Sequence, residues 1–490
     1  MFTNKQHEKA QRKNNITNSH LNNYNTPQQM THPPTTKLNK EILRLAIPSI
    51  LANLTVPLVG MVDIAVAGHL HHLGTLGTAA FIGGITIGSL LFDLLYWNFA
   101  FLRVGTGGLV AQAYGSNDKE ECANVFVRSV VLALCSAAVI LLLQWPFQKL
   151  AFLVVKTTPA VHDLALRYFF IRIWAAPATL SLMAFRGWFV GMQDSFSSML
   201  TDLTVNLVNI VASIVLTLGI GSWHGLGFNG IALGTVVAQY AGLLLAIAIV
   251  ATKYHNMPFS LQWPGREKLR TYMRMNNDLF IRSLCFIAIY IGFTTLAARY
   301  GDVFLSATSI IMKILMLFSY ITDGFAYSGE ALAGRFIGER NKSELRRTVR
   351  YVFLWSMGVA GLFMAVYGLG GDWLVSLMTD DETVANACHP FLWWLLLMPP
   401  LGCVAFTWDG IYTGATASRA IRNAMILAIA AFAIVYIAGT LCTHIPTEGS
   451  DQQLEIGAMN LLMAAYFAHL IARTIHLTLR YNTDVLARAE

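Results

Sequence analysis

Long apolar segments separated by short polar ones recur along most of the chain. Each long segment can cross a bilayer as a helix, because the hydrocarbon core requires roughly 20 residues. Proline and glycine inside these segments do not argue against helices, since membrane helices tolerate both. We expect twelve spans, near residues 43–68, 77–103, 123–145, 162–190, 195–219, 228–252, 277–299, 304–333, 347–369, 384–414, 418–443 and 455–480.

The composition supports a membrane protein. Only 12% of the 490 residues are charged and 55% are hydrophobic, with a mean hydropathy of +0.53. A soluble domain carries about 25% charged residues, because its surface faces water. A water-soluble globule is therefore excluded.

The positive charge, +7 overall, lies mainly in the connections that follow even-numbered spans. Connections after odd-numbered spans are nearly free of Lys and Arg: 69–76, 220–227, 370–383 and 444–453 have none, and the exceptions are Lys149, Lys156 and Arg299. By the positive-inside rule, both termini are cytoplasmic in a multi-pass inner (cytoplasmic) membrane protein. The charge thus reports topology, and we expect no nucleic-acid partner.

Two motifs recur at one offset. The segment 109–115 resembles 332–338, and Gly187 with Gly191 recurs as Gly410 with Gly414, both 223 residues apart. Six spans were duplicated, which predicts an all-α fold of two pseudo-symmetric six-helix bundles, typical of transporters. We expect a disordered cytoplasmic tail at 1–40, an N-lobe at 41–252, a cytoplasmic connector at 253–276, a C-lobe at 277–482 and a C-terminal tail at 483–490.

Asp63 is the ionisable residue of the first span, and such residues are costly enough to be functional candidates. Pro48 and Pro57 each remove a backbone hydrogen bond and permit the helix to bend. A carboxyl merely capped by neighbouring hydroxyls is the alternative interpretation. At about 100° per residue, Asp63 shares a face of small and weakly polar residues with Ser49, Ala52, Val56, Gly60 and Ala67.

The fifth span carries a polar stripe at spacings of three and four residues. Five polar groups facing lipid would be too costly, so the stripe faces the lobe interior or water. It either coordinates a cation together with Asp63 or joins helices by hydrogen bonds, and the sequence leaves both open. The stripe consists of Asp202, Asn206, Asn209, Ser213 and Thr217.

The second half has its own intramembrane polar residues. Asp323, Tyr327 and Glu330 share one face of the eighth span, and Asp409 lies on the tenth. Lys313 is expected to form a neutralised ion pair with a carboxylate from another helix, mainly in a structural role. These five residues make a candidate second-lobe polar site.

Cofactor chemistry is not expected. There is no phosphate-binding G-x-x-x-x-G-K-[ST] loop, so this chain itself does not consume ATP. The six cysteines show no C-x-x-C spacing and indicate buried thiols rather than a metal site. Asp380-Asp381 is a weak sign of a prenyltransferase-type membrane enzyme, since no second acidic motif accompanies it.

From about residue 41 to 480 the chain resembles the MATE (multidrug and toxic compound extrusion) family, in particular its DinF-like branch. No single motif is decisive, but their order fits twelve spans. The motifs are Ile47-Pro48 with Asn53-Leu54, Val62-Asp63-x-Ala65-x-x-Gly68-His69, Phe101-Leu102-Arg103, Gly108-Leu109-x-Ala111-Gln112-Ala113-x-Gly115, Thr322-Asp323-Gly324-x-Ala326-Tyr327-x-x-Glu330 and Asp409-Gly410-Ile411-x-x-Gly414-Ala415-Thr416.

The resemblance implies a V-shaped pair of bundles and export of organic, often cationic and amphipathic compounds in exchange for protons or sodium. It implies that Asp63 is the coupling carboxylate, that Pro48 permits bending, and that Asn209 is a lobe asparagine of an N-x-x-x-D motif. Ser213 stands where that motif has its aspartate. Losing that carboxylate weakens sodium binding, so the sequence favours protons over sodium.

The leading hypothesis is therefore a secondary antiporter working by alternating access, with small organic molecules and membrane lipid as partners and a monomer as sufficient unit. A flippase for lipid-linked precursors is the alternative, which requires several basic residues in the cleft to meet diphosphate. Lys313 and Arg282 are the candidates for these. A membrane enzyme is the second alternative.

Overall fold

The computed structural model describes residues 35–68, 70, 78–154, 157–260, 265–300, 302–379, 381–443 and 452–490. Residues 39–490 form one compact unit. Within the described residues, twelve helical segments are long and apolar enough to cross a membrane. The predicted number of spans and the all-helical fold class are confirmed.

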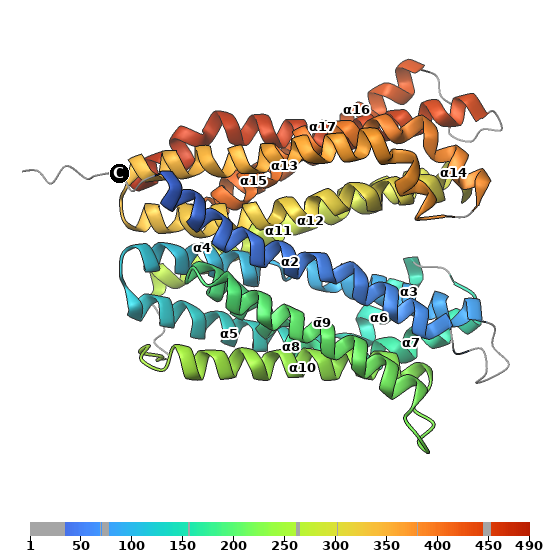
Figure 1. The fold of residues 1–490 in the computed structure, drawn as a ribbon, viewed down its shortest axis with the longest axis horizontal. Helices are drawn as coiled ribbons and strands as arrows, with labels where there is room; N and C mark the ends of the chain where they lie inside the picture. Colours follow the sequence, from blue (N-terminus) through green and yellow to red (C-terminus); the bar gives the residue numbers. More distant parts are fainter. Residues whose placement is uncertain are drawn as a thin grey trace, which may run out of the picture. The chain divides into compact units, whose positions relative to one another are not determined.

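The helices of the first half and those of the second half form two groups (Figure 1). Each group has its own apolar core, which gathers side chains from helices of that half. The first half contains α2 (Thr35–Gly68), α3 (Thr78–Trp97), α4 (Phe101–Gly115), α5 (Lys119–Leu142), α6 (Gln144–Val154), α7 (Pro159–Arg172), α8 (Ala176–Gly191), α9 (Ser195–Leu218) and α10 (Phe228–Lys253). The second half contains α11 (Arg266–Ala297), α12 (Asp302–Gly338), α13 (Lys342–Ser376), α14 (Glu382–Cys388), α15 (Leu392–Gly414), α16 (Ser418–Thr443) and α17 (Gln452–Asp484).

The second span is not one helix, as expected for 77–103, but two. It breaks between the end of α3 at Trp97 and the start of α4 at Phe101, near the middle of the span. Short local bonds satisfy the backbone there: Phe99 N–H donates to Tyr96 O at 2.9 Å. Neither Gly nor Pro marks this break in the sequence, which is why the apolar pattern did not reveal it.

Three predicted boundaries also differ from the structure. Helix α2 begins at Thr35, so 35–40 is helical rather than tail, while 1–34 lies outside the described residues. The connector predicted at 253–276 is partly helix, because α11 already begins at Arg266. The predicted tail at 483–490 is folded: its 3-10 turn buries Leu486 because the chain packs back on the second half.

The duplication seen in the sequence reappears in the local structure. Asn117 and Arg340, 223 residues apart, both have positive φ values, 58° and 53°. Each is followed by a helix cap, because Asp118 accepts from Glu121 N–H and Asn341 accepts from Glu344 N–H. The two halves therefore repeat their turns and helix starts as well as their spans.

The halves contact each other mainly near the ends of α4 and α12. Gln112 donates its side-chain amide to Gly414 O at 2.9 Å, and Gln193 donates to Ala331 O at 2.7 Å. On α2, the contacts go to both halves: Asn53 donates to Tyr320 O at 3.0 Å, and Thr55 accepts from Asn206. A relative motion of the two halves would therefore change the contacts of helix α2.

Candidate functional site

Asp63 of α2 is buried, with 7% of its surface exposed. Its Oδ1 atom is buried without a hydrogen-bond partner among the described residues. The Ser213 hydroxyl of α9 and the Arg172 guanidinium of α7 are the polar groups that act on this carboxyl. An ionised carboxylate in such a place is costly, so it requires a proton or a cation.

The polar stripe of α9 divides into two parts. Asn209, Ser213 and Thr217 are buried, and each has a side-chain oxygen without a hydrogen-bond partner among the described residues. Asn209 donates to Thr235 of α10 at 3.1 Å, which leaves its own oxygen free. Asn209 thus joins α9 to α10, and the three residues leave side-chain oxygens without hydrogen-bond partners among the described residues. Ser213, on the same face of α9, interacts with Asp63.

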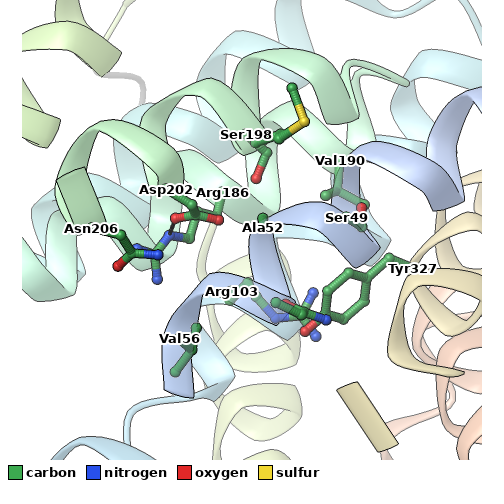
Figure 2. Close-up of a pocket in the computed structure, with 12 residues that line it drawn as sticks. Ser49, Ala52, Val56, Arg103, Arg186, Val190, Ser198, Asp202, Asn206 and Tyr327 are labelled. Carbon is green, nitrogen blue, oxygen red and sulfur yellow. Dashed lines mark ion pairs between the residues drawn. The ribbon is translucent and has the colours of Figure 1, made fainter. Parts of the chain in front are cut away.

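Asp202 belongs to a different place, so a single cation site that includes both Asp202 and Asp63 is excluded. It forms an ion pair of 2.5 Å with Arg186 of α8. Figure 2 shows this pair, with Asn206 beside it, in a cavity of about 130 Å³. The separation follows from geometry, because Asp202 and Ser213 lie eleven residues, about 16 Å, apart along the helix.

The second-half residues Asp323, Tyr327, Glu330 and Asp409 do lie together, around a cavity of about 150 Å³. Arg103 of α4 joins them from the first half. Its guanidinium makes an ion pair of 3.1 Å with Glu330 and lies 4.4 Å from the centre of the Tyr327 ring. Glu330 is 1% exposed, so this is a desolvated pair between the two halves.

Asp409 of α15 is shared by two arginines. Arg282 of α11 approaches it at 3.1 Å and Arg473 of α17 at 3.3 Å. Asp323, in contrast, makes no ion pair with a described residue. Four arginines and four carboxylates therefore meet around the two cavities, and their formal charges cancel; they are Arg103, Arg186, Arg282, Arg473, Asp202, Asp323, Glu330 and Asp409.

Lys313 does not join this network, and the ion pair expected for it is wrong. Its side chain is exposed, and it makes no ion pair with a described residue. Lys313 lies ten residues before Asp323, about 15 Å along α12, too far to reach the carboxylates around the cavity. The sequence pattern gives the face of a helix but not the depth at which partners from other helices lie.

The Asp380-Asp381 motif has a local structural role. Asp381 caps α14 by accepting from Thr383 N–H and Val384 N–H, whereas Asp380 lies outside the described residues. Pro48 and Pro57 both lie inside the continuous helix α2. They leave the helix intact while each removes one of its backbone hydrogen bonds.

Sequence reasoning missed several charged residues that the structure brings together. Arg186 and Arg473 form ion pairs, and Arg172 interacts electrostatically with both Asp63 and Asp93. The available signal was simple: each is an ionisable residue inside a predicted span. For this reason the sequence analysis underestimated the number of basic residues available to a flippase. All four arginines of the network nevertheless pair with carboxylates and are not free to bind diphosphate; they are Arg103, Arg186, Arg282 and Arg473.

Two repeated helical halves with charged groups gathered between and within them define a polytopic membrane transporter rather than an enzyme. The family model MatE matches residues 48–215 and 279–440. The chain belongs to this family of transporters.

Individual relatives agree. The chain is 34% identical over 405 residues to DNA damage-inducible protein F of Escherichia coli, covering 82% of this chain and 86% of that protein. It is 22% identical over 351 residues to a probable multidrug resistance protein, NorM, of Idiomarina loihiensis, covering 71% and 74%. A solved MOP superfamily transporter from Pyrococcus furiosus has a TM-score of 0.75 at 19% identity, covering 90% and 96%, which shows the fold.

Proposed function

We propose that this protein is a secondary antiporter that exports organic, often cationic and amphipathic compounds in exchange for protons. It works by alternating access in the inner membrane, as a monomer with both termini cytoplasmic and without cofactor or metal. The observation that carries the proposal is Asp63, a buried carboxyl whose Oδ1 has no hydrogen-bond partner among the described residues. A group in this state has a strong preference for binding a small cation, and a proton needs no coordination cage.

Sodium is the second candidate for the coupling ion. Asn209 Oδ1 and Ser213 Oγ are buried oxygens without hydrogen-bond partners among the described residues. They lie one helical turn apart on α9, on the face that reaches Asp63, and hard cations prefer such oxygen ligands. Protons remain the first candidate because Ser213 brings no second charge to neutralise sodium.

The contacts between the halves support alternating access. Gln112 and Gln193 bind the opposite half near the ends of α4 and α12, the end that the charge pattern assigns to the cytoplasm. A state closed at that end exposes its site to the outside. Helix α2 carries Asp63 and contacts both halves, so ion binding at Asp63 has a route to their relative motion.

The test is transport by the purified protein in liposomes. A fluorescent organic cation is followed under an imposed pH gradient, and separately under a sodium gradient, for the unaltered protein and for Asp63→Asn. We expect movement driven by the pH gradient alone and its loss in Asp63→Asn, with unchanged thermal stability. Asp163→Asn, which removes an exposed carboxylate on α7, is the matched control and should transport normally.

Other outcomes decide between the alternatives. Movement driven only by sodium would keep the antiporter and replace the ion. Retained proton-driven export by Asp63→Asn would contradict the role of Asp63. Absence of gradient-driven movement in either case would contradict the antiporter itself, and lipid-linked substrates would then be assayed.

A further inference from the structure

Asp93 stands on the last full turn of α3, one turn before Trp97, at the break in the second span. Its side chain is exposed, and it makes no hydrogen bond or ion pair with a described residue. Trp97 lies four residues on, so the two side chains share one face of α3. A carboxylate this deep in a membrane protein, left without a partner, marks a functional site.

The face that carries Asp93 and Trp97 points toward the second half of the protein. The Trp97 ring packs edge-on against Phe286 and Tyr290 of α11, with ring centres 5.9 and 5.4 Å apart. Tyr290 and Tyr320 of α12 both lie close enough to Asp93 to interact with its charge. Asp93 therefore lies near aromatic residues of three helices, α3, α11 and α12.

Arg172 of α7 connects this site with Asp63. It donates to Tyr168 Oη at 2.9 Å and to Ser89 Oγ at 3.4 Å, and it lies 4.8 Å from the centre of the Phe92 ring. Ser89 and Phe92 are on the turns of α3 next to Asp93. The single guanidinium interacts electrostatically with both Asp63 and Asp93.

The charges of this cluster do not cancel, in contrast to the network around the two cavities. Asp63 and Asp93 bring two negative charges, and Arg172 brings one positive charge. The other groups that interact with them are neutral, Ser213 at Asp63 and Tyr290 and Tyr320 at Asp93. Tyr320 also interacts with Asp323, a carboxylate already counted in the network around the two cavities. Lys313 lies seven residues before Tyr320, about 10 Å along α12, and makes no ion pair with a described residue.

We propose that Asp93, with Trp97, Tyr290 and Tyr320, is the binding site for the positive group of an amphipathic organic cation. Carboxylate and aromatic rings are the two partners such cations prefer, and tryptophan is the strongest ring for the purpose. The cluster lacks one positive charge, so one bound monocation neutralises it. This inference rests on the proposed antiport function and names the place where its substrate binds.

The shared arginine gives the site its link to the coupling ion. When a proton or sodium ion neutralises Asp63, the charge of Arg172 compensates Asp93 alone. The attraction between Asp93 and the organic cation is then weakened. When the organic cation occupies Asp93, Arg172 compensates Asp63 and the coupling ion is no longer required. The two cations thus exclude each other, although they bind to different carboxylates.

The test is equilibrium binding to the purified full chain in nanodiscs, with tetraphenylphosphonium as cation and tetraphenylborate as an anion of the same shape. We expect Asp93→Asn to weaken tetraphenylphosphonium binding about tenfold or more, because the variant removes the carboxylate that pairs with the cation. Tetraphenylborate binding should not weaken. Trp97→Leu should weaken cation binding about threefold or more through the lost ring.

Coupling is measured by repeating the titration across pH and across sodium concentration. In the unaltered protein one of these cations should compete with tetraphenylphosphonium. Asp63→Asn mimics the neutralised carboxyl, so its tetraphenylphosphonium binding should be weak and should no longer change with pH or sodium. Asp163→Asn serves as control and should change neither. Circular dichroism and melting temperature verify that each variant is folded.

The possible outcomes distinguish a failure of the Asp93 site from a failure of the proposed antiport function. Equal cation binding by Asp93→Asn, in a protein that still shows gradient-driven transport, would overturn the Asp93 site and leave the antiporter standing. Absence of tetraphenylphosphonium binding by the unaltered protein would overturn the substrate class. Competition that persists in Asp63→Asn would overturn the link through Arg172.

Discussion

Gly115 lies directly against the main-chain carbonyl of Arg335, so closely that a Cβ atom at Gly115 would be 1.9 Å from that oxygen. The same contact occurs a second time, because a Cβ at Gly338 would be 2.0 Å from the carbonyl oxygen of Gln112. Gly115 and Gly338 are 223 residues apart, and so are Gln112 and Arg335. The two halves therefore close on each other through a reciprocal, pseudo-two-fold pair of glycine contacts.

We predict that Gly115→Ala and Gly338→Ala weaken the closed contact between the halves. Both carbonyl oxygens are backbone atoms, so the helices themselves have to move apart. Overpacking of this kind costs about 1–3 kcal/mol. The measurement is the melting temperature in detergent, together with labelling of a cysteine placed beside Gln112, which should become more accessible.

Gly358→Ala and Gly361→Ala on α13 are the controls, because a Cβ at either position would meet no described atom within 4 Å apart from the backbone of its own helix. Both should melt at or above the temperature of the unaltered protein, since alanine favours helix over glycine. A control that destabilises as much as Gly115→Ala would refute the packing argument.

Glu330 is paired with one arginine and Asp409 with two, and this difference predicts a rank order of stability. Glu330→Gln leaves one arginine, Arg103, without its carboxylate, whereas Asp409→Asn leaves both Arg282 and Arg473. Breaking a buried pair by removing one partner costs about 3–5 kcal/mol. We expect both variants to melt lower than the unaltered protein, and Asp409→Asn lowest.

The exposed ion pair between Asp163 and Arg167, each 60% exposed, is the reference for this series. Asp163→Asn should change stability by less than about 1 kcal/mol. The double variant Arg103→Met/Glu330→Gln should recover part of the loss of Glu330→Gln, because no unpaired charge remains. An equal melting temperature for all single variants would contradict the assigned burial of these pairs.

Asp202→Asn distinguishes the two parts of the α9 stripe. Asp202 is paired with Arg186 and lies about 16 Å along the helix from Ser213. We therefore expect the variant to lose stability, as Arg186 is left unpaired, but to keep the ion dependence of transport. Loss of gradient coupling with an unchanged melting temperature would assign Asp202 to the coupling site after all.

Pro57→Ala tests the bending of α2. Alanine supplies the backbone N–H that Pro57 lacks and removes a clash that costs about 3 kcal/mol in a helix interior. The helix should become stiffer, so we expect an equal or higher melting temperature and a several-fold lower turnover with unchanged substrate affinity. Unchanged turnover in the liposome assay would mean that α2 does not need to bend at this position.

The number of spans and the duplication could be predicted from the sequence, because each depends on a pattern within a single segment of the chain. Twelve spans follow from the lengths of apolar segments, and the duplication follows from repeated glycine motifs such as Gly187 and Gly410. Polar positions on one helix face were also predictable, and Asp323, Tyr327 and Glu330 do line one cavity. Periodicity alone suffices for such statements, because it concerns one helix at a time.

Only the tertiary structure decided which charges meet. Arg103 pairs with Glu330 across 227 residues, Lys313 makes no ion pair with a described residue, and Arg172 interacts electrostatically with both Asp63 and Asp93. These relations depend on the rotation and depth of one helix relative to another. Helices of equal hydropathy satisfy the bilayer at many rotations and depths, so packing between helices, rather than their apolar pattern, determines where an ion or substrate finds its partners.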